Sequence, residues 1–235
     1  MREAITTTKR ESALSIDGFF PETVVSLAAR CQTVSLPRTP GGYDIRLART
    51  NFQQGAVSRL VRRMYAWRGY SMQPSVYPQN DPNRATLAVW KEEDVVATLT
   101  IGLDSSEGLL ADGLYAQELA GLRSPGRRVC EVTQLAVHPE FSCERMLNAL
   151  FRTALIYGKE YLRASDAVIE VNPRHVRFYE RRFGFRQVGK LRQCERVNAP
   201  AVLLHQTLDS LIVSDNGLDY LHDEWSGNAP LAAAS

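Results

Sequence analysis

The sequence predicts an α/β (α+β) fold in which helices flank a mixed central sheet of about seven strands. Residues 129–137 and 167–172 have the composition of buried strands, and the helical pattern between them implies that the two strands are parallel. Residues 86–90 and 95–103 are separated by a short polar turn, which predicts an antiparallel hairpin. A sheet that contains both kinds of pairing is mixed.

The first expected elements are a strand and a basic helix. Residues 43–48 alternate apolar and polar side chains, as a half-exposed strand does. Asn51 is a suitable N-cap for the helix that follows. The apolar face of this helix carries Val57, Leu60, Val61 and Met64. The opposite face is cationic and carries Arg59, Arg62, Arg63 and Arg68.

The hairpin and a weakly periodic segment come next. Residues 69–83 are rich in proline and predict a loop. Alternation in the second hairpin strand places four apolar side chains on one face: Val95, Ala97, Leu99 and Ile101. Residues 114–122 are compatible with a helix, which the Ser124-Pro125-Gly126 sequence would end.

The central unit is a strand, a turn, a helix and a strand. His138-Pro139 ends the first strand, because proline has no N–H for a sheet ladder. Ser142 is the expected N-cap of the helix, and Glu144 suits its first turn. Apolar residues then recur at helical spacing: Met146, Leu147, Leu150, Phe151, Ala154, Leu155 and Leu162. Pro173 ends the second strand.

The C-terminal part of the domain is expected to add one helix and two strands. The helix spans about residues 174–182 and turns Val176, Tyr179 and Phe183 inward. Gly184 stands where a helix commonly ends in a left-handed residue. Residues 185–191 and 201–207 then predict two strands, separated by Asn198-Ala199-Pro200.

Composition defines the expected domain organisation and compartment. With 235 residues and 44% hydrophobic content, the chain suffices for one core with extensions. We expect an N-terminal extension (1–42), a catalytic domain (43–208) and an acidic tail (209–235). Four scattered cysteines without a CxxC pair suit a reducing compartment and give no metal-ligand spacing. The sequence contains no secretory signal, integral membrane segment or nucleic-acid-binding module, so we expect a cytoplasmic protein.

Residues 172–185, Asn-Pro-Arg-His-Val-Arg-Phe-Tyr-Glu-Arg-Arg-Phe-Gly-Phe, resemble the GNAT acyltransferases. That family has an Asn or similar group at the end of its fifth strand, a Tyr in the next helix and a Gly-Phe pair before the sixth strand. The resemblance covers about residues 43–208. It implies a GNAT fold in which strands four and five splay apart and admit the pantetheine arm of the acyl donor.

The loop after the fourth strand departs from the GNAT pattern. Relatives that use acetyl-CoA have a glycine-rich loop here, whose amides bind the pyrophosphate. Residues 138–144 contain no glycine, one proline, and the carboxylates of Glu140 and Glu144, which would repel a diphosphate. This loop favours acyl carrier protein as the donor, because its phosphopantetheine arm carries no adenosine diphosphate. No permanently bound cofactor is expected.

The fourth strand narrows the resemblance further. Its sequence from Glu131 to Val137 is similar to the Glu-x-Ser-Arg-Phe-x-Val strand of acyl-homoserine lactone synthases, with Thr133 in place of Ser and Gln134 in place of Arg. The chain more closely resembles the long-chain N-acyl amino acid synthases. These enzymes join a fatty acyl group from acyl carrier protein to the α-amine of an amino acid.

Two residues are the catalytic candidates. An amino acid's ammonium must lose a proton before it attacks a thioester, and Glu131 is the expected base because burial would raise its pKa. Alternatively, Glu131 is a structural carboxylate paired with Arg127, Arg128 or another nearby Arg. The resemblance gives Tyr179 the role of protonating the departing thiolate; the alternative is an ordinary half-buried aromatic side chain.

Other residues are candidates for binding. Leu135, Ala136 and Val137 are expected to bind the donor and to offer amides to the oxyanion. Asn172 binds the pantetheine arm or caps the next turn. Thr133 and Gln134 are candidates for contact with the amino acid. His138 and His175 flank the cleft, and we interpret them as turn residues.

Two basic faces suit docking of an acidic carrier protein: Arg59, Arg62 and Arg63, and Arg174, Arg177 and Arg181. Solvated helix faces are the alternative interpretation. The predicted function is therefore acyl transfer from acyl carrier protein to an amino acid. Three alternatives stay open: a lactone synthase, a CoA-dependent N-acetyltransferase, and a non-catalytic GNAT domain that binds acylated carrier protein.

Overall fold

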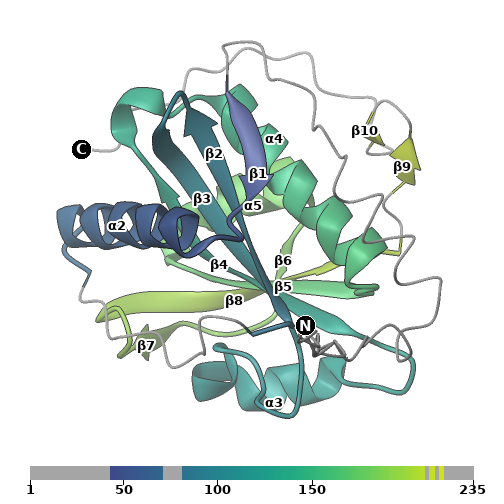
Figure 1. The fold of residues 1–235 in the computed structure, drawn as a ribbon. Helices are drawn as coiled ribbons and strands as arrows, with labels where there is room; N and C mark the ends of the chain where they lie inside the picture. The colour runs from purple at the N-terminus through teal and green to yellow at the C-terminus, as the bar shows by residue number, and fades with distance from the viewer. Residues whose placement is uncertain (1–42, 71–80, 210–211, 215–216, 220–235) are drawn as a thin grey trace, which may run out of the picture. The chain divides into compact units, whose positions relative to one another are not determined.

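A computed structural model describes residues 43–70, 81–209, 212–214 and 217–219 (Figure 1). The helices are α2 (Asn51–Trp67), α3 (Asp112–Leu122), α4 (Glu144–Ile156) and α5 (Val176–Phe183). The strands are β1 (Asp44–Leu47), β2 (Arg84–Lys91), β3 (Asp94–Leu103), β4 (Val129–Val137), β5 (Asp166–Val171), β6 (Arg186–Gln187), β7 (Arg192–Cys194), β8 (Ala199–Thr207), β9 (Ile212–Ser214) and β10 (Gly217–Asp219).

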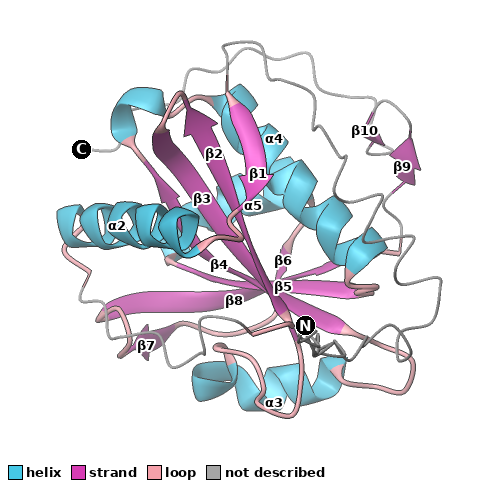
Figure 2. Cartoon of the chain, in the orientation of Figure 1, coloured by secondary structure: helices cyan, strands magenta, loops and turns pink. Residues whose placement is uncertain are grey.

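The described residues form one mixed sheet of eight strands and a separate pair, β9 and β10 (Figure 2). The order is β1-β2-β3-β4-β5-β8-β6, and β7 pairs with β8. β4 and β5 are parallel, whereas the other pairs are antiparallel. The predicted mixed sheet with a parallel central pair is confirmed. Within the eight-stranded sheet, β7 is the strand that the sequence did not predict, and the β9–β10 pair was not predicted either.

Helices cover both faces of the sheet (Figure 1). Along β5, Ala167 and Ile169 belong to the same core as α4 and α5, whereas Val168 packs with α3. Along β2, Ala88 and Trp90 pack with α2 on the face opposite α4. Because successive strand residues point to opposite faces, α2 and α3 share one face and α4 and α5 share the other.

Helix α2 has the predicted faces but a different cap. Val57, Leu60, Val61 and Met64 are buried, as predicted. The N-cap is Thr50 and not Asn51: the Thr50 hydroxyl accepts from the Gln53 amide at 3.2 Å, and the Gln53 side chain accepts from the Thr50 amide at 3.1 Å. This reciprocal capping box satisfies two free amides at once, which is why the helix begins after Thr50.

A bulge in β3 changes the predicted alternation. Trp90 pairs with Val95 and Val89 with Ala97, so Val96 is an extra residue. Val95 therefore packs beside the α2 core, whereas Ala97, Leu99 and Ile101 face α4. The prediction that all four share one face is wrong for Val95.

The start of α4 also differs from the prediction. Cys143 occupies the N-cap position and makes no side-chain cap. Ser142 instead closes a 3-10 turn, Pro139–Phe141, with its amide donating to the Pro139 carbonyl at 3.2 Å. Ser142 as N-cap is therefore wrong, because the turn after β4 uses that residue. The helix continues into a π-helical turn, Tyr157–Tyr161.

The C-terminal elements follow the predicted order with shorter strands. Gly184 ends α5 in the left-handed conformation, with φ of 69°, as predicted. The predicted strand over 185–191 is too long: the amides of Val188 and Gly189 both donate to the Leu203 carbonyl, which ends the ladder after Gln187. Ala199 and Pro200 belong to β8 and not to the preceding turn.

Several expectations concern parts of the chain outside the described residues. Residues 1–42, 71–80 and 220–235 are not described, so the N-terminal extension, most of the proline-rich loop and most of the acidic tail stay predictions. The domain limits at residues 43 and 208 stay predictions too. In the described ranges, every helix is too short or too polar for a membrane span.

Gly189 lies where the backbone approaches a buried aromatic ring. A Cβ there would lie 2.6 Å from the Tyr115 ring and 2.7 Å from the Leu203 Cβ. We expect Gly189→Ala to lower the free energy of unfolding by about 1–3 kcal/mol, because the ring has to move. Gly121→Ala is the matched control, since a Cβ added at this position in α3 would meet nothing within 4 Å. Urea denaturation measures the free energy of unfolding of both variants. A Gly189→Ala variant as stable as wild type would contradict the prediction.

Candidate active site

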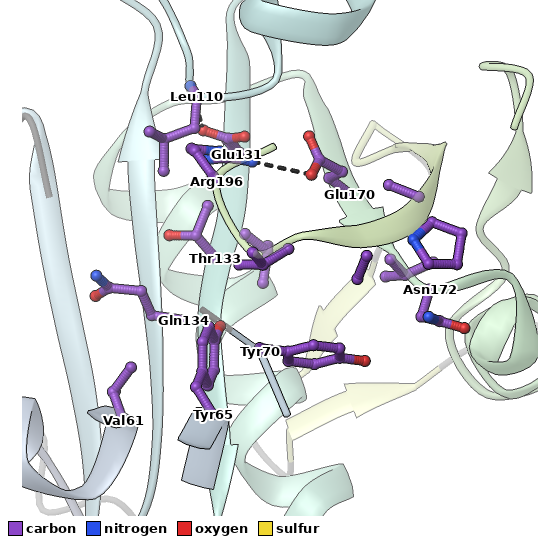
Figure 3. A pocket seen from close by; sticks show the side chains of 16 residues that line it. Val61, Tyr65, Tyr70, Leu110, Glu131, Thr133, Gln134, Glu170, Asn172 and Arg196 are labelled. Carbon is purple, nitrogen blue, oxygen red and sulfur yellow. Dashed lines mark hydrogen bonds and ion pairs between the residues drawn. The ribbon is translucent and has the colours of Figure 1, made fainter. Parts of the chain in front are cut away.

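A cavity of about 210 Å³ lies where β4 and β5 separate (Figure 3). Its walls come from α2, the segment before α3, the two strands, and the turn between β7 and β8. The two strands pair over four positions, from Val129↔Asp166 to Val132↔Ile169. Beyond these pairs, residues of both strands line the cavity instead. The predicted splay of the fourth and fifth strands is therefore confirmed.

A bulge in β4 accompanies the separation. Thr133 pairs with Thr100 and Ala136 with Thr98, so β4 contains one residue more than β3 over this interval. Gln134 has a φ of 52°, the left-handed conformation that non-glycine residues rarely adopt. Its side-chain oxygen accepts from the Thr100 hydroxyl at 3.0 Å. This hydrogen bond holds the bulged residue at the cavity.

Glu131 is a fully buried carboxylate in the cavity wall, with 0% exposure. Its two oxygens accept from the amides of Leu110 (2.8 Å) and Ala111 (2.9 Å), in the segment before α3. Burial raises the pKa of Glu131 to about 7, although these two hydrogen bonds and the charges of Arg196 and Arg84 oppose the shift. The carboxyl group can therefore exchange a proton near neutral pH.

The alternative pairing of Glu131 with Arg127 or Arg128 is not what the structure has. Arg127 forms ion pairs with Asp166 at 2.7 Å and with Asp209 at 2.5 Å. Arg128 donates to the Leu162 carbonyl at 3.1 Å. Both arginines are therefore engaged elsewhere, and the Glu131 oxygens bond to backbone amides.

A second carboxylate lines the cavity and forms an ion pair. Glu170 of β5 contacts Arg196 through one oxygen at 2.9 Å, and its side chain is 10% exposed (Figure 3). Its other oxygen, Oε2, is buried and has no hydrogen-bond partner among the described residues. Neither residue was predicted from the sequence. The sequence of β5 does contain a signal for Glu170. It lies two residues after Val168, so the two side chains are on the same face of the sheet.

The predicted acceptor-binding residues both reach the cavity. Thr133 and Gln134 line it, and the Thr133 hydroxyl is buried without a partner in the described part of the chain. Asn172 lines the opposite wall, and its side chain accepts from the Arg174 amide at 3.2 Å, so it caps the turn after β5. Both predicted roles of Asn172 are compatible with this position.

The predicted donor-binding residues of β4 lie beside the cavity. Ala136 and Val137 pair with β3, and their side chains pack with the α2 and α4 cores respectively. Leu135 packs against the α4 core. None of the three is among the cavity-lining residues of the described chain. Any role in donor binding therefore falls to their backbone.

Tyr179 lies on the opposite face of the sheet from Glu131. Its ring packs among Phe151, Phe178, Phe183 and Phe185, and burial raises the pKa of its hydroxyl. It does not line the cavity.

Two other tyrosines, Tyr65 and Tyr70, line the cavity and were not predicted from the sequence. Their rings meet edge to face, with centroids 5.9 Å apart. Tyr65 follows Val61 by four residues on α2, a spacing that places both on one side of the helix. Burial raises the pKa of Tyr65 to about 12. That helical spacing is the signal that could have identified Tyr65.

The predicted docking arginines are exposed. Those of α2 (Arg59, Arg62, Arg63) and those near α5 (Arg174, Arg177, Arg181) all reach solvent. Arg174 also donates to the Tyr70 hydroxyl at 3.3 Å, which links the end of α2 to the start of α5. Arg63 also contacts His138 at the end of β4. The second predicted turn histidine, His175, is partly buried, and this burial lowers its pKa to about 4.

The loop after β4 uses two of its amides, those of Phe141 and Ser142, within its own 3-10 turn. The Phe141 amide donates to the His138 carbonyl at 3.1 Å, and Pro139 has no N–H. Glu144 forms an ion pair with Arg182, so only Glu140 of the two loop carboxylates has no ion pair within the described chain.

The described residues contain no group of three or more His, Cys, Asp or Glu suited to a metal ion.

Comparison with known proteins identifies a family over most of the domain. The family described as N-acyl amino acid synthase FeeM matches residues 56–207, which is more than half of the chain. The structure of FeeM, an N-acyl amino acid synthase from uncultured soil microbes, is 28% identical, with a TM-score of 0.67. The match covers 71% of this chain and 92% of that one. Among curated proteins, no significant match is found.

Two further solved structures share the fold at lower identity. A putative N-acetyltransferase from Lactobacillus plantarum is 14% identical with a TM-score of 0.54, and the match covers 71% of this chain and 98% of that one. The AHL synthase LasI is 13% identical with a TM-score of 0.52, and the match covers 72% and 91% of the two chains. These likenesses confirm the GNAT fold.

The raised pKa of Glu131 predicts a pH-dependent stability. Between about pH 4.5 and about pH 7, the folded protein holds a proton at Glu131 that the unfolded chain releases. The stabilisation is therefore fully present below this window and is lost as the pH rises through it, by on the order of 3 kcal/mol. Urea denaturation of wild type and Glu131→Gln at a series of pH values measures this difference. A difference that stays constant across the window would contradict the raised pKa.

Proposed function

The chain belongs to the N-acyl amino acid synthase FeeM family, and on that premise we propose that it transfers a long-chain fatty acyl group from acyl carrier protein to the α-amine of an amino acid. The acceptor occupies the cavity between β4 and β5, and the transfer is direct, without a covalent acyl-enzyme. The observation that carries the proposal is the buried Glu131 carboxyl group at the point where the strands part.

Glu131 acts as the general base. An amino acid's ammonium has no lone pair, so one proton must leave before the nitrogen attacks the thioester carbonyl. A carboxylate whose pKa burial raises to about 7 accepts that proton more readily than an ordinary glutamate, directly or through water. The amides of Leu110 and Ala111 hold both of its oxygens and fix its position in the wall.

As the C–S bond breaks, the attacking nitrogen releases its second proton to solvent, and the departing thiolate requires a proton from an acid. Tyr179 is the acid in our proposal, because the resemblance to GNAT acyltransferases gives it this role and its hydroxyl is protonated at neutral pH. Tyr179 belongs to the core on the α4 and α5 face, whereas Glu131 lines the cavity on the other face, so the separated strands lie between the proposed acid and the base.

Three features support acyl carrier protein as the donor. The gap between β4 and β5 suits a pantetheine arm, whose amides can bond to unpaired strand backbone. The loop after β4 contains no glycine, and its Phe141 and Ser142 amides donate within the 3-10 turn, so it departs from the glycine-rich pyrophosphate loop of CoA-dependent relatives. The exposed arginines of α2 and α5 match the acidic surface expected of a carrier protein.

The direct test is a reconstituted assay. Purified protein with long-chain acyl carrier protein and a mixture of amino acids is expected to give N-acyl amino acids, detected by mass spectrometry. Glu131→Gln should lower kcat at least about tenfold, which corresponds to about 1.4 kcal/mol, because the base is lost while the side-chain volume and one of the two accepted hydrogen bonds are kept. The proposal fails if long-chain acyl-CoA is the better donor, or if Glu131→Gln is fully active.

Carrier-protein docking predicts a charge effect that a small donor does not share. Arg177→Glu should raise KM for acyl carrier protein roughly threefold or more at low salt, and less at high salt. An acyl-pantetheine thioester has no protein surface, so its KM should not change. The matched control is Arg186→Glu, an exposed arginine on the edge strand β6. Equal effects of the two variants would contradict docking at α5.

A further inference from the structure

The cavity contains a charged pair whose arrangement suits an amino acid. Arg196 lies in the turn between β7 and β8, and its Nη2 contacts one oxygen of Glu170 at 2.9 Å (Figure 3). The same nitrogen approaches the Cys194 sulfur at 3.6 Å. A guanidinium has five N–H donors in a planar fork, so contacts through one nitrogen leave donors for a second anion.

Arg196 is the one lysine or arginine among the cavity-lining residues of the described chain. Two carboxyl groups, Glu131 and Glu170, line the same cavity. A carboxylate-bearing substrate that entered without a cation nearby would be repelled by both. Arg196 therefore determines whether such a substrate can bind with its amine toward Glu131.

Glu170 complements the opposite end of the same substrate. Its side chain is 10% exposed, and its Oε2 is buried with no partner among the described residues. An unsatisfied buried oxygen is costly unless a ligand donates to it. The Thr133 hydroxyl, which is also buried without a partner in the described chain, lies in the same wall. Both groups can accept from the N–H donors of an incoming ammonium.

The hairpin that carries Arg196 is fixed to the body of the domain. The Tyr115 hydroxyl donates to the carbonyls of Lys190 (3.1 Å) and Ala201 (2.8 Å), before and within the hairpin. Arg192 of β7 forms an ion pair with Glu118 of α3 at 2.7 Å. These contacts fix the hairpin, and the ion pair with Glu170 holds the Arg196 guanidinium before a substrate enters, which reduces the entropy lost on binding.

We propose that Arg196 binds the α-carboxylate of the acceptor amino acid, and that Glu170 positions the guanidinium and accepts a hydrogen bond from the α-amine. This inference rests on the proposed function and specifies how its acceptor is recognised. Acceptors that lack a carboxylate are then poor substrates. Glu170 is a positioning residue, since it acts on the reaction through Arg196 and the amine.

The test compares acceptors with and without the negative charge. The amino acid that wild type uses best is assayed beside its carboxamide, with wild type, Arg196→Gln and the control Arg186→Gln. Arg196→Gln should lower kcat/KM for the amino acid at least roughly thirtyfold, mainly through KM, and should change the carboxamide little. The preference for the amino acid then collapses. An intact, active Arg196→Gln that keeps the wild-type preference would overturn the inference.

Two further measurements cover other outcomes. Removing Arg196 leaves Glu170 as an unpaired buried charge, so the neutral double variant Glu170→Gln/Arg196→Gln is assayed in case the single variant does not fold. Glu170→Gln alone should raise KM for the amino acid more than it lowers kcat.

If wild type acylates no acceptor, the proposed function fails, and calorimetry with the free amino acids then tests whether Arg196 binds their carboxylate. Equal binding by wild type and the double variant would reject the carboxylate site.

Discussion

The separation of β4 from β5 is the constraint on which the site depends. If the two strands paired beyond Val132 and Ile169, backbone hydrogen bonds would occupy the space that the cavity now takes. The extra residue at Gln134 diverts β4, and its left-handed backbone carries a cost that the hydrogen bond from Thr100 helps to offset. The unpaired strand backbone then requires partners, and the pantetheine arm of the proposed donor carries amides that can supply them.

The cavity gives two glutamates opposite properties through their surroundings. Glu131 accepts from two backbone amides and forms no ion pair, so desolvation outweighs the opposing charges of Arg196 and Arg84 and raises its pKa to about 7. Glu170 meets the guanidinium of Arg196, which compensates its charge. In our proposal, proton transfer falls to Glu131 and substrate positioning to Glu170, because only Glu170 has an ion-pair partner.

The two faces of the sheet have different tasks. The α4 and α5 face is an aromatic and aliphatic core that includes Tyr179 and Phe151. The α2 and α3 face is interrupted by the cavity, and the turn between β7 and β8 and the start of β8 form part of its wall. Tyr115 ties that hairpin to α3, so a segment distant from β4 in sequence supplies Arg196 to the site.

The sequence by itself determined the order of the elements, the parallel central pair and the buried carboxylate. These follow from local patterns: helical spacing in α2, alternation in the hairpin, prolines after β4 and β5, and a glutamate inside an apolar strand. Tertiary structure decided the bulges at Val96 and Gln134, the choice of Thr50 as cap, and the Glu170–Arg196 pair, whose members are 26 residues apart. Each of these depends on side chains that meet across the sheet or on small differences between neighbouring positions, and local periodicity contains no information on either.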